Sequence, residues 1–236
     1  MKKILGLLMA LIISVPMVAN ATTYSVEEDM TIDFDDSIWY VFTRDNIEDN
    51  SELDELGISY DYIYDLLNNN HMYIDAVVYY NDGSDFIEIL VRKKENSEIK
   101  NFTNYTNDDL MDFAKELAKK TGAEEYSVYE NDYKFAYSNY YDSSANYYVD
   151  EYYTIVNGYG YTITAQKLTE FDDAEKYFVR TIIDTITFDI DTSLKENTSN
   201  NSIITAIIIG AGVGIVIGGS AGLTNKIIKK KSKNNI

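Results

Sequence analysis

The sequence predicts an α+β fold in which a central antiparallel sheet is flanked by amphipathic helices, with one transmembrane helix near the C-terminus. Short runs of β-branched and aromatic residues recur through residues 22–193, and turn signals such as Asn157-Gly158 separate several of them. Between these runs lie stretches whose apolar residues repeat at helical spacing. Residues 203–223 carry no charge and are long enough, as a helix, to cross a bilayer.

Residues 1–21 have the order of a secretory signal peptide, with a basic start, an apolar centre and small residues at Ala19 and Ala21. Cleavage after Ala21 leaves Thr22 as the new N-terminus, and an uncleaved anchor is the alternative. The chain contains no cysteine, which excludes a lipoprotein anchor and disulfide bonds.

The first half of the domain predicts strands, then helices, then a hairpin. Ile63, Leu66 and Leu67 lie on one side of a predicted helix, and Asp82-Gly83 is a hairpin signal between two long strands. The strands are expected at 24–26, 30–34, 38–44, 72–80 and 86–94, and the helices at 51–57 and 59–70.

The clearest helix in the second half begins at Thr106, which forms a capping-box pattern with Asp109, and ends at Gly122. Strands follow at 125–130, 132–140 and 146–156, and Asn157-Gly158 predicts another hairpin. A last amphipathic helix places Phe171, Ala174, Phe178 and Ile182 on one face, and a strand-like ITFDI ends the domain.

Residues 194–202 are expected to form a short polar stalk before the transmembrane helix 203–223, and residues 224–236 a basic cytoplasmic tail. The tail carries Lys226, Lys229, Lys230, Lys231 and Lys233, so it should stay inside while residues 22–193 lie outside the cell membrane. A buried soluble helix is the alternative.

Glycines in the apolar segment permit two further interpretations. No register fits the Gly-x-Gly-x-x-Gly dinucleotide fingerprint, which excludes a nucleotide fold here. The glycines recur at every fourth residue and so form one smooth stripe on a helix, which lets another helix approach closely. This favours a homodimer, with a monomeric anchor as the alternative. The glycines are Gly210, Gly214, Gly218 and Gly222.

The segment between the two apolar ends is strongly acidic. It holds all 39 acidic residues and 13 of the basic ones, a net charge of −26. Nucleic acid and bare anionic membrane are therefore poor partners for it and no nucleic acid is expected to bind, whereas cations or basic surfaces would be attracted.

Two stretches resemble a known family. YYTIVNGYGYTITAQKL, followed by an amphipathic helix and TIIDTITFDI, is similar to the C-terminal half of PsbP-like and Mog1-like domains, in particular membrane-anchored bacterial versions. YSVEEDMTIDFDDSIWYVFTRD is similar to their start, although Asp35, Asp36 and Ser37 replace the usual proline before the tryptophan. The resemblance implies a helix-flanked antiparallel sheet used for binding rather than catalysis, and it transfers no ligand and no functional residue.

Residues suited to catalysis are scarce. Without cysteine, and with His71 as the only histidine, thiol nucleophiles and histidine-rich zinc sites are excluded. His71 follows a helix end, where it is expected to cap carbonyls rather than act as a base. No cofactor is expected apart from Ca²⁺, for which Asp33, Asp35 and Asp36 are the candidate ligands and Asp189 with Asp191 a further pair.

The 22 tyrosines are the most unusual feature of the composition. Cross-strand pairs in the sheet are one interpretation, and a row that binds a glycan or protein is the other. The sequence thus predicts a non-catalytic single-pass surface protein whose extracytoplasmic domain binds an unidentified ligand or protein. The alternatives are an extracytoplasmic hydrolase using paired carboxylates and an envelope assembly or structural factor.

Overall fold

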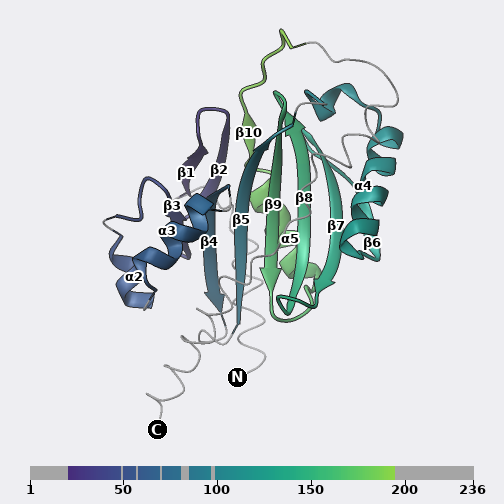
Figure 1. Ribbon diagram of the computed structural model, residues 1–236. Helices are drawn as coiled ribbons and strands as arrows, with labels where there is room; N and C mark the ends of the chain where they lie inside the picture. Colours follow the sequence, from purple (N-terminus) through teal and green to yellow (C-terminus); the bar gives the residue numbers. More distant parts are fainter. Residues whose placement is uncertain are drawn as a thin grey trace.

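Antiparallel β-sheets dominate the computed structural model, which describes residues 21–48, 50–56, 58–69, 71–80, 85–96 and 99–194. In this part of the chain ten strands form one sheet of seven strands and one of three, and short helices lie against the larger sheet (Figure 1).

The larger sheet has the strand order β3-β4-β5-β9-β8-β7-β6, with every neighbouring pair antiparallel. Most neighbours in space are also neighbours in sequence, and the pairing of β5 with β9 joins the two halves of the chain. The strands are β3 (Trp39–Thr43), β4 (Met72–Tyr80), β5 (Asp85–Glu95), β6 (Glu125–Glu130), β7 (Lys134–Asp142), β8 (Tyr147–Val156) and β9 (Tyr159–Lys167).

Turn chemistry explains the predicted hairpin between β8 and β9. Asn157 and Gly158 have φ angles of 53° and 79°, the pair of left-handed conformations that a tight hairpin turn requires. Asn tolerates this conformation and glycine adopts it freely, so the hairpin prediction is confirmed.

The smaller sheet joins the two ends of the domain. It consists of β1 (Ala21–Val26), β2 (Met30–Asp35) and β10 (Thr187–Phe188), with β2 in the middle. The burial of β2 alternates strictly, so that Ile32 and Phe34 are fully buried while Asp33 and Asp35 point away from the core.

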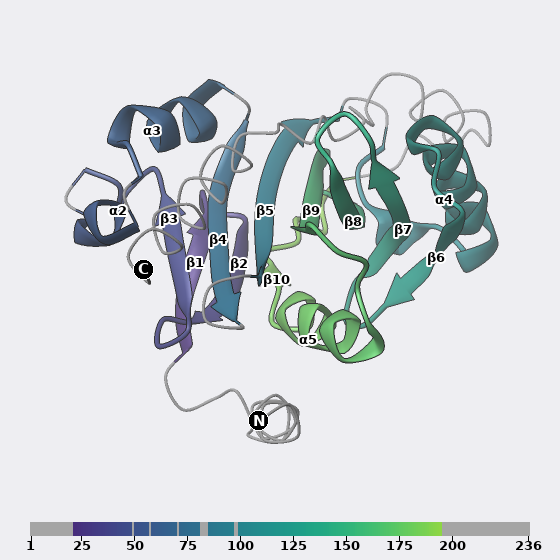
Figure 2. The same ribbon diagram turned by 90° about the horizontal axis from the view of Figure 1, so that it is seen from below.

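Helices cover the larger sheet from both sides (Figure 2). Helix α5 packs with the smaller sheet into one apolar cluster on one face, while α3 and α4 bury separate apolar clusters on the other. The helices are α2 (Ser51–Leu56), α3 (Tyr60–Asn69), α4 (Asn107–Thr121), α5 (Asp173–Ile183) and the 3-10 turn η2 (Phe102–Asn104).

Side-chain caps determine where the two best-formed helices begin. Thr106 and Asp109 form the predicted capping box at α4, and Gly122 ends that helix with a φ of 76°. At α5, Asp172 and Glu175 form a second capping box. Each satisfies backbone N–H groups that have no partner within the helix.

The expected fold class is wrong, because the regular structure of the described chain is mainly antiparallel sheet and its helices are few and short. Each amphipathic segment covers only a part of the sheet and does not form a layer of its own. None of the helices in the described ranges combines the length and the apolar character needed to cross a membrane. The predicted span 203–223 and its four glycines lie outside the described residues.

Candidate functional site: an acidic cavity beside the smaller sheet

A cavity of about 330 Å³ lies where the smaller sheet meets the start of α2. Strand β1, the β2–β3 turn, strand β3 and the segment leading into α2 supply its walls. Among its described lining residues there are two acids and no base. The lining residues are Tyr24, Asp36, Trp39, Val41, Asn46, Asn50, Ser51 and Glu52.

The β2–β3 turn positions Asp36. Asp35 closes the turn, because its side chain accepts a hydrogen bond from the Ser37 N–H at 3.0 Å and its carbonyl accepts one from Ile38 at 3.0 Å. Asp36 then lies at the exposed tip, where Tyr24 Oη donates to one carboxylate oxygen at 2.7 Å and Thr22 Oγ1 to the other at 2.5 Å.

Trp39 forms a rigid wall of the cavity. The residue is 2 % exposed, stacks on Phe178 with ring centroids 5.7 Å apart, and meets Phe34 edge-on at 5.2 Å. Its indole Nε1 is buried and has no hydrogen-bond partner among the described residues. Because buried donors are normally satisfied, this N–H group is an exception within the described fold.

Two asparagines hold the segment between β3 and α2. Asn46 accepts from Thr43 N–H and donates to the Val41 carbonyl, both at 2.8 Å. Asn50 Oδ1 accepts from the Glu52 N–H at 3.0 Å at the start of α2. These side-chain to backbone bonds fix the wall of the cavity that carries Glu52.

The charges of the cavity converge on Tyr24. Burial raises the pKa of the Tyr24 phenol, and the hydrogen bond and charge of Asp36 and the charge of Glu52 raise it further. Both carboxylates therefore act on the same hydroxyl, although they lie on different elements. Tyr24 stays protonated at neutral pH and remains a hydrogen-bond donor.

The residues singled out as Ca²⁺ ligands do not converge. Asp33 accepts from Thr23 Oγ1 at 2.7 Å on the outer face of β2, Asp35 is used by its own turn, and only Asp36 lines the cavity. Within the described ranges, no group of three or more acidic or histidine side chains is placed to hold a metal. Calcium binding stays a prediction from the sequence.

His71 lies where its position in the sequence suggests. It is exposed in the turn between α3 and β4, with a φ of 54°, and its carbonyl accepts a hydrogen bond from the Lys93 N–H at 3.3 Å. The expected position at a helix end is confirmed.

A second polar feature crosses the larger sheet between the apolar clusters of α3 and α4. Glu88 lies opposite Gln166 and receives a hydrogen bond from its amide, and Glu151 lies opposite Thr164 and accepts from Tyr140 Oη at 3.3 Å. We call this set the polar row; it consists of Asp75, Glu88, Glu151, Thr164 and Gln166, each no more than 4 % exposed.

Burial changes the protonation of the acids in the polar row. It raises the pKa of Glu151 to about 7. Burial, together with the charge of Glu88 and a hydrogen bond with it, raises the pKa of Asp75 well above its ordinary value. In the sequence, these residues can be noticed only as single acids within otherwise apolar strands. That they lie on one face of the sheet follows from the strand register, which the sequence does not show.

The sequence does not identify most of the residues that line the cavity. Only Asp36 was singled out, whereas Tyr24, Trp39 and Glu52 belong to segments that read as ordinary strand or helix. Comparison with models of known protein families finds no match for this chain, and comparison with proteins of described function finds none either. The likeness to PsbP-like and Mog1-like domains therefore stays a prediction.

Proposed function

We propose that this chain is a non-catalytic binding domain whose acidic cavity receives a cationic group, an ammonium or a guanidinium, of a ligand or protein partner. The observation that carries the proposal is the pair of carboxylates, Asp36 and Glu52, around the Tyr24 hydroxyl in a cavity without a lining base. An extracytoplasmic location, supported by residues 1–21, belongs to the same proposal.

Electrostatics favour a cation over other ligands. A unit charge about 4 Å from a carboxylate gains roughly 1 kcal/mol in water and about 4 kcal/mol near a protein surface. The net charge of −26 on the acidic segment also attracts cations from a distance. Neither effect favours an anionic or neutral ligand.

The size of the cavity limits the ligand. At about 330 Å³ it is close to the smallest volume usual for small-molecule sites. It suits a single basic side chain or a small amine better than an oligosaccharide. The buried Trp39 ring, already stacked on Phe178, is not available to stack on a sugar.

The test is a titration of the protein with N-acetyl-lysine methylamide, followed by NMR. We expect Glu52→Gln to weaken binding roughly fivefold, since one lost charge interaction costs about 1 kcal/mol. Binding should also weaken as salt screens the carboxylates.

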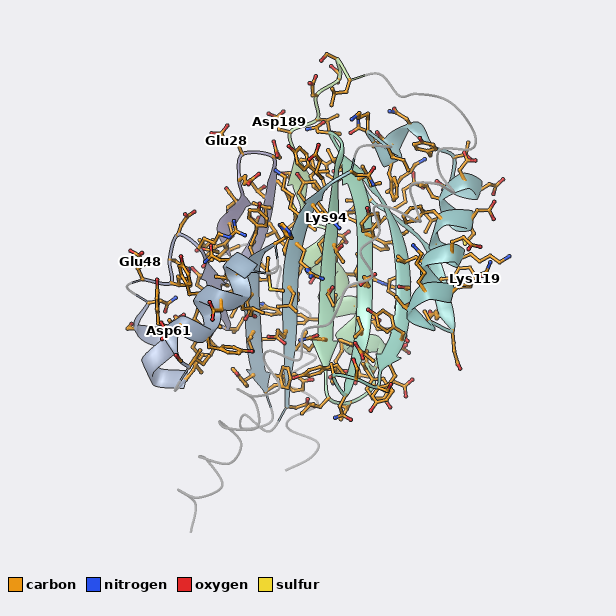
Figure 3. All side chains as sticks on the ribbon, in the orientation of Figure 1. Glu28, Glu48, Asp61, Lys94, Lys119 and Asp189 are labelled. Carbon is orange, nitrogen blue, oxygen red and sulfur yellow. The ribbon has the colours of Figure 1, made fainter. Side chains whose placement is uncertain are left out.

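Two controls separate this site from the general acidity of the protein. N-acetyl-norleucine methylamide has the same shape without the charge and should not bind. Glu28→Gln removes an acid at the tip of the β1–β2 hairpin (Figure 3); Glu28 does not line the cavity, so this change should leave binding unaltered. Equal binding of the charged and uncharged compounds, or equal effects of the two substitutions, would contradict the proposal.

A further inference from the structure

The start of β1 lies beside the acidic cavity. Thr22 Oγ1 donates to Asp36 Oδ2 at 2.5 Å, and the antiparallel register places Ala21 opposite Asp35 and Thr22 opposite Phe34. The backbone nitrogen of Thr22 is separated from that hydroxyl only by Cα and Cβ. A charge on this nitrogen would therefore lie next to the Asp36 carboxylate.

The sequence places a leader cleavage site at this same bond. Ala19 and Ala21 are the small residues that precede a signal-peptide cleavage site, and the Ala21–Thr22 bond is at the exposed start of the strand. The rest of β1 does not depend on Ala21, because Thr23 Oγ1 donates to Asp33 and Val26 is fully buried.

We propose that leader removal after Ala21 creates a Thr22 α-ammonium group that pairs with Asp36 and thereby gives the acidic cavity a cation of its own. A peptide-bond hydrolase adds water across the Ala21–Thr22 bond. The carbon–nitrogen bond breaks, Ala21 leaves as a carboxylate, and the Thr22 nitrogen leaves the amide and becomes a protonated amine. Before cleavage the same nitrogen is a neutral amide, so processing changes the charge beside Asp36.

The groups around this amine are almost all acidic. Strand β2 and the following turn contribute three carboxylates, and α2 contributes the Glu52 carboxylate. Strand β1 contributes the neutral Tyr24 phenol. Opposite charges nearby favour the protonated amine, which remains cationic through neutral pH. The carboxylates of β2 and the turn are those of Asp33, Asp35 and Asp36.

This cation would compete for the cavity with an added ligand. The competition rests on the proposed function, whereas the ion pair with Asp36 does not. A chain that keeps its leader, or is acetylated at Thr22, lacks the competitor and should bind the lysine compound more tightly.

The first measurement establishes the ion pair. Mass spectrometry of the protein from cells that make it should show a chain beginning at Thr22. In that full-length mature chain, the pKa of the α-amine, followed by NMR after ¹³C-dimethylation, should lie above the ordinary 7.7 to 8.0. Asp36→Asn should return it towards that range, while Asp61→Asn, an exposed acid on α3, should not (Figure 3).

The second measurement tests the competition, by titrating the free and the N-acetylated mature chain with N-acetyl-lysine methylamide. We expect at least twofold tighter binding to the acetylated chain. A chain that begins elsewhere, or an amine pKa that Asp36→Asn does not change, overturns the ion pair. Equal binding to both chains overturns the competition only, and binding to neither form, with the pKa still raised, overturns the proposed function only.

Discussion

Two lysines have buried side chains, and the ammonium group of each pairs with carboxylates. Lys93, on β5, pairs with Glu27 and Asp29 of the β1–β2 turn and so ties the larger sheet to the smaller one. Lys167, at the end of β9, pairs with Glu175 of α5 and lies 2.7 Å from Tyr80 Oη. Buried charges of this kind persist only when paired, because each ion loses its hydration.

The pair at α5 gives a prediction for single residues. Lys167→Met leaves Glu175 buried without its cation, so the free energy of unfolding in urea should fall by roughly 3 to 5 kcal/mol. Lys176→Met is the matched control, since its partner Glu125 is largely exposed at 3.2 Å and the loss should stay below about 1 kcal/mol. Similar losses in the two variants would show that burial does not decide the strength of these pairs.

At the level of strands and helices, the burial of the tyrosines shows where both faces of the larger sheet are covered. Tyr140 is 7 % exposed and its neighbour Tyr141 is 48 % exposed, as alternation along a strand predicts. Tyr152 and its neighbour Tyr153 are both buried, because α5 covers one face and α4 the other at this position. Ring pairs such as Tyr137 with Tyr152, 5.1 Å apart, join adjacent strands.

The polar row on the central strands gives a pH-dependent prediction. Glu151 has an ordinary pKa of 4.5, which burial raises to about 7 in the folded protein. Between about pH 4.5 and 7 the unfolded chain loses this proton and the folded protein keeps it, so the free energy of unfolding falls as pH rises. The loss from this group is on the order of 3 kcal/mol across that window.

Urea unfolding at several pH values checks this prediction. In the Glu151→Gln protein, the free energy of unfolding should change less with pH across that window than in the unmodified protein. Part of the pH dependence should remain, because the pKa of Asp75 is also raised. Glu170→Gln, which changes an exposed acid, should leave the slope unaltered. An identical slope in the Glu151→Gln protein would show that Glu151 is not protonated in the fold.

For the whole molecule, the largest apolar cluster joins both sheets, and the chain around it carries a large excess of acidic over basic residues. The largest cluster contains Phe34 of the smaller sheet, Trp39 and Ile89 of the larger sheet, and Ile182 of α5. The segment between the apolar ends contains 39 acidic and 13 basic residues. Like charges at this density repel each other, and this repulsion destabilises the compact folded state more than the expanded unfolded chain.

Salt should therefore stabilise this protein. Raising sodium chloride from about 10 mM to about 1 M shortens the screening length from roughly 30 Å to 3 Å, which removes most of the repulsion between surface carboxylates. We expect the midpoint of urea unfolding to move to higher urea concentration. A midpoint that falls with salt would indicate that attractive pairs, such as Lys93 with Glu27, outweigh the repulsion.

Local features of this protein could be predicted from its sequence alone. The capping box of Thr106 with Asp109 and the Asn157-Gly158 turn depend on residues close together in the chain, and both appear as expected. Tertiary structure alone decided that β1 and β2 form a separate sheet with β10, and that Asp36 and Glu52 approach one phenol. It also decided which acids share the polar row, because strand register and sheet partners depend on contacts between residues far apart in the chain, which local patterns do not encode.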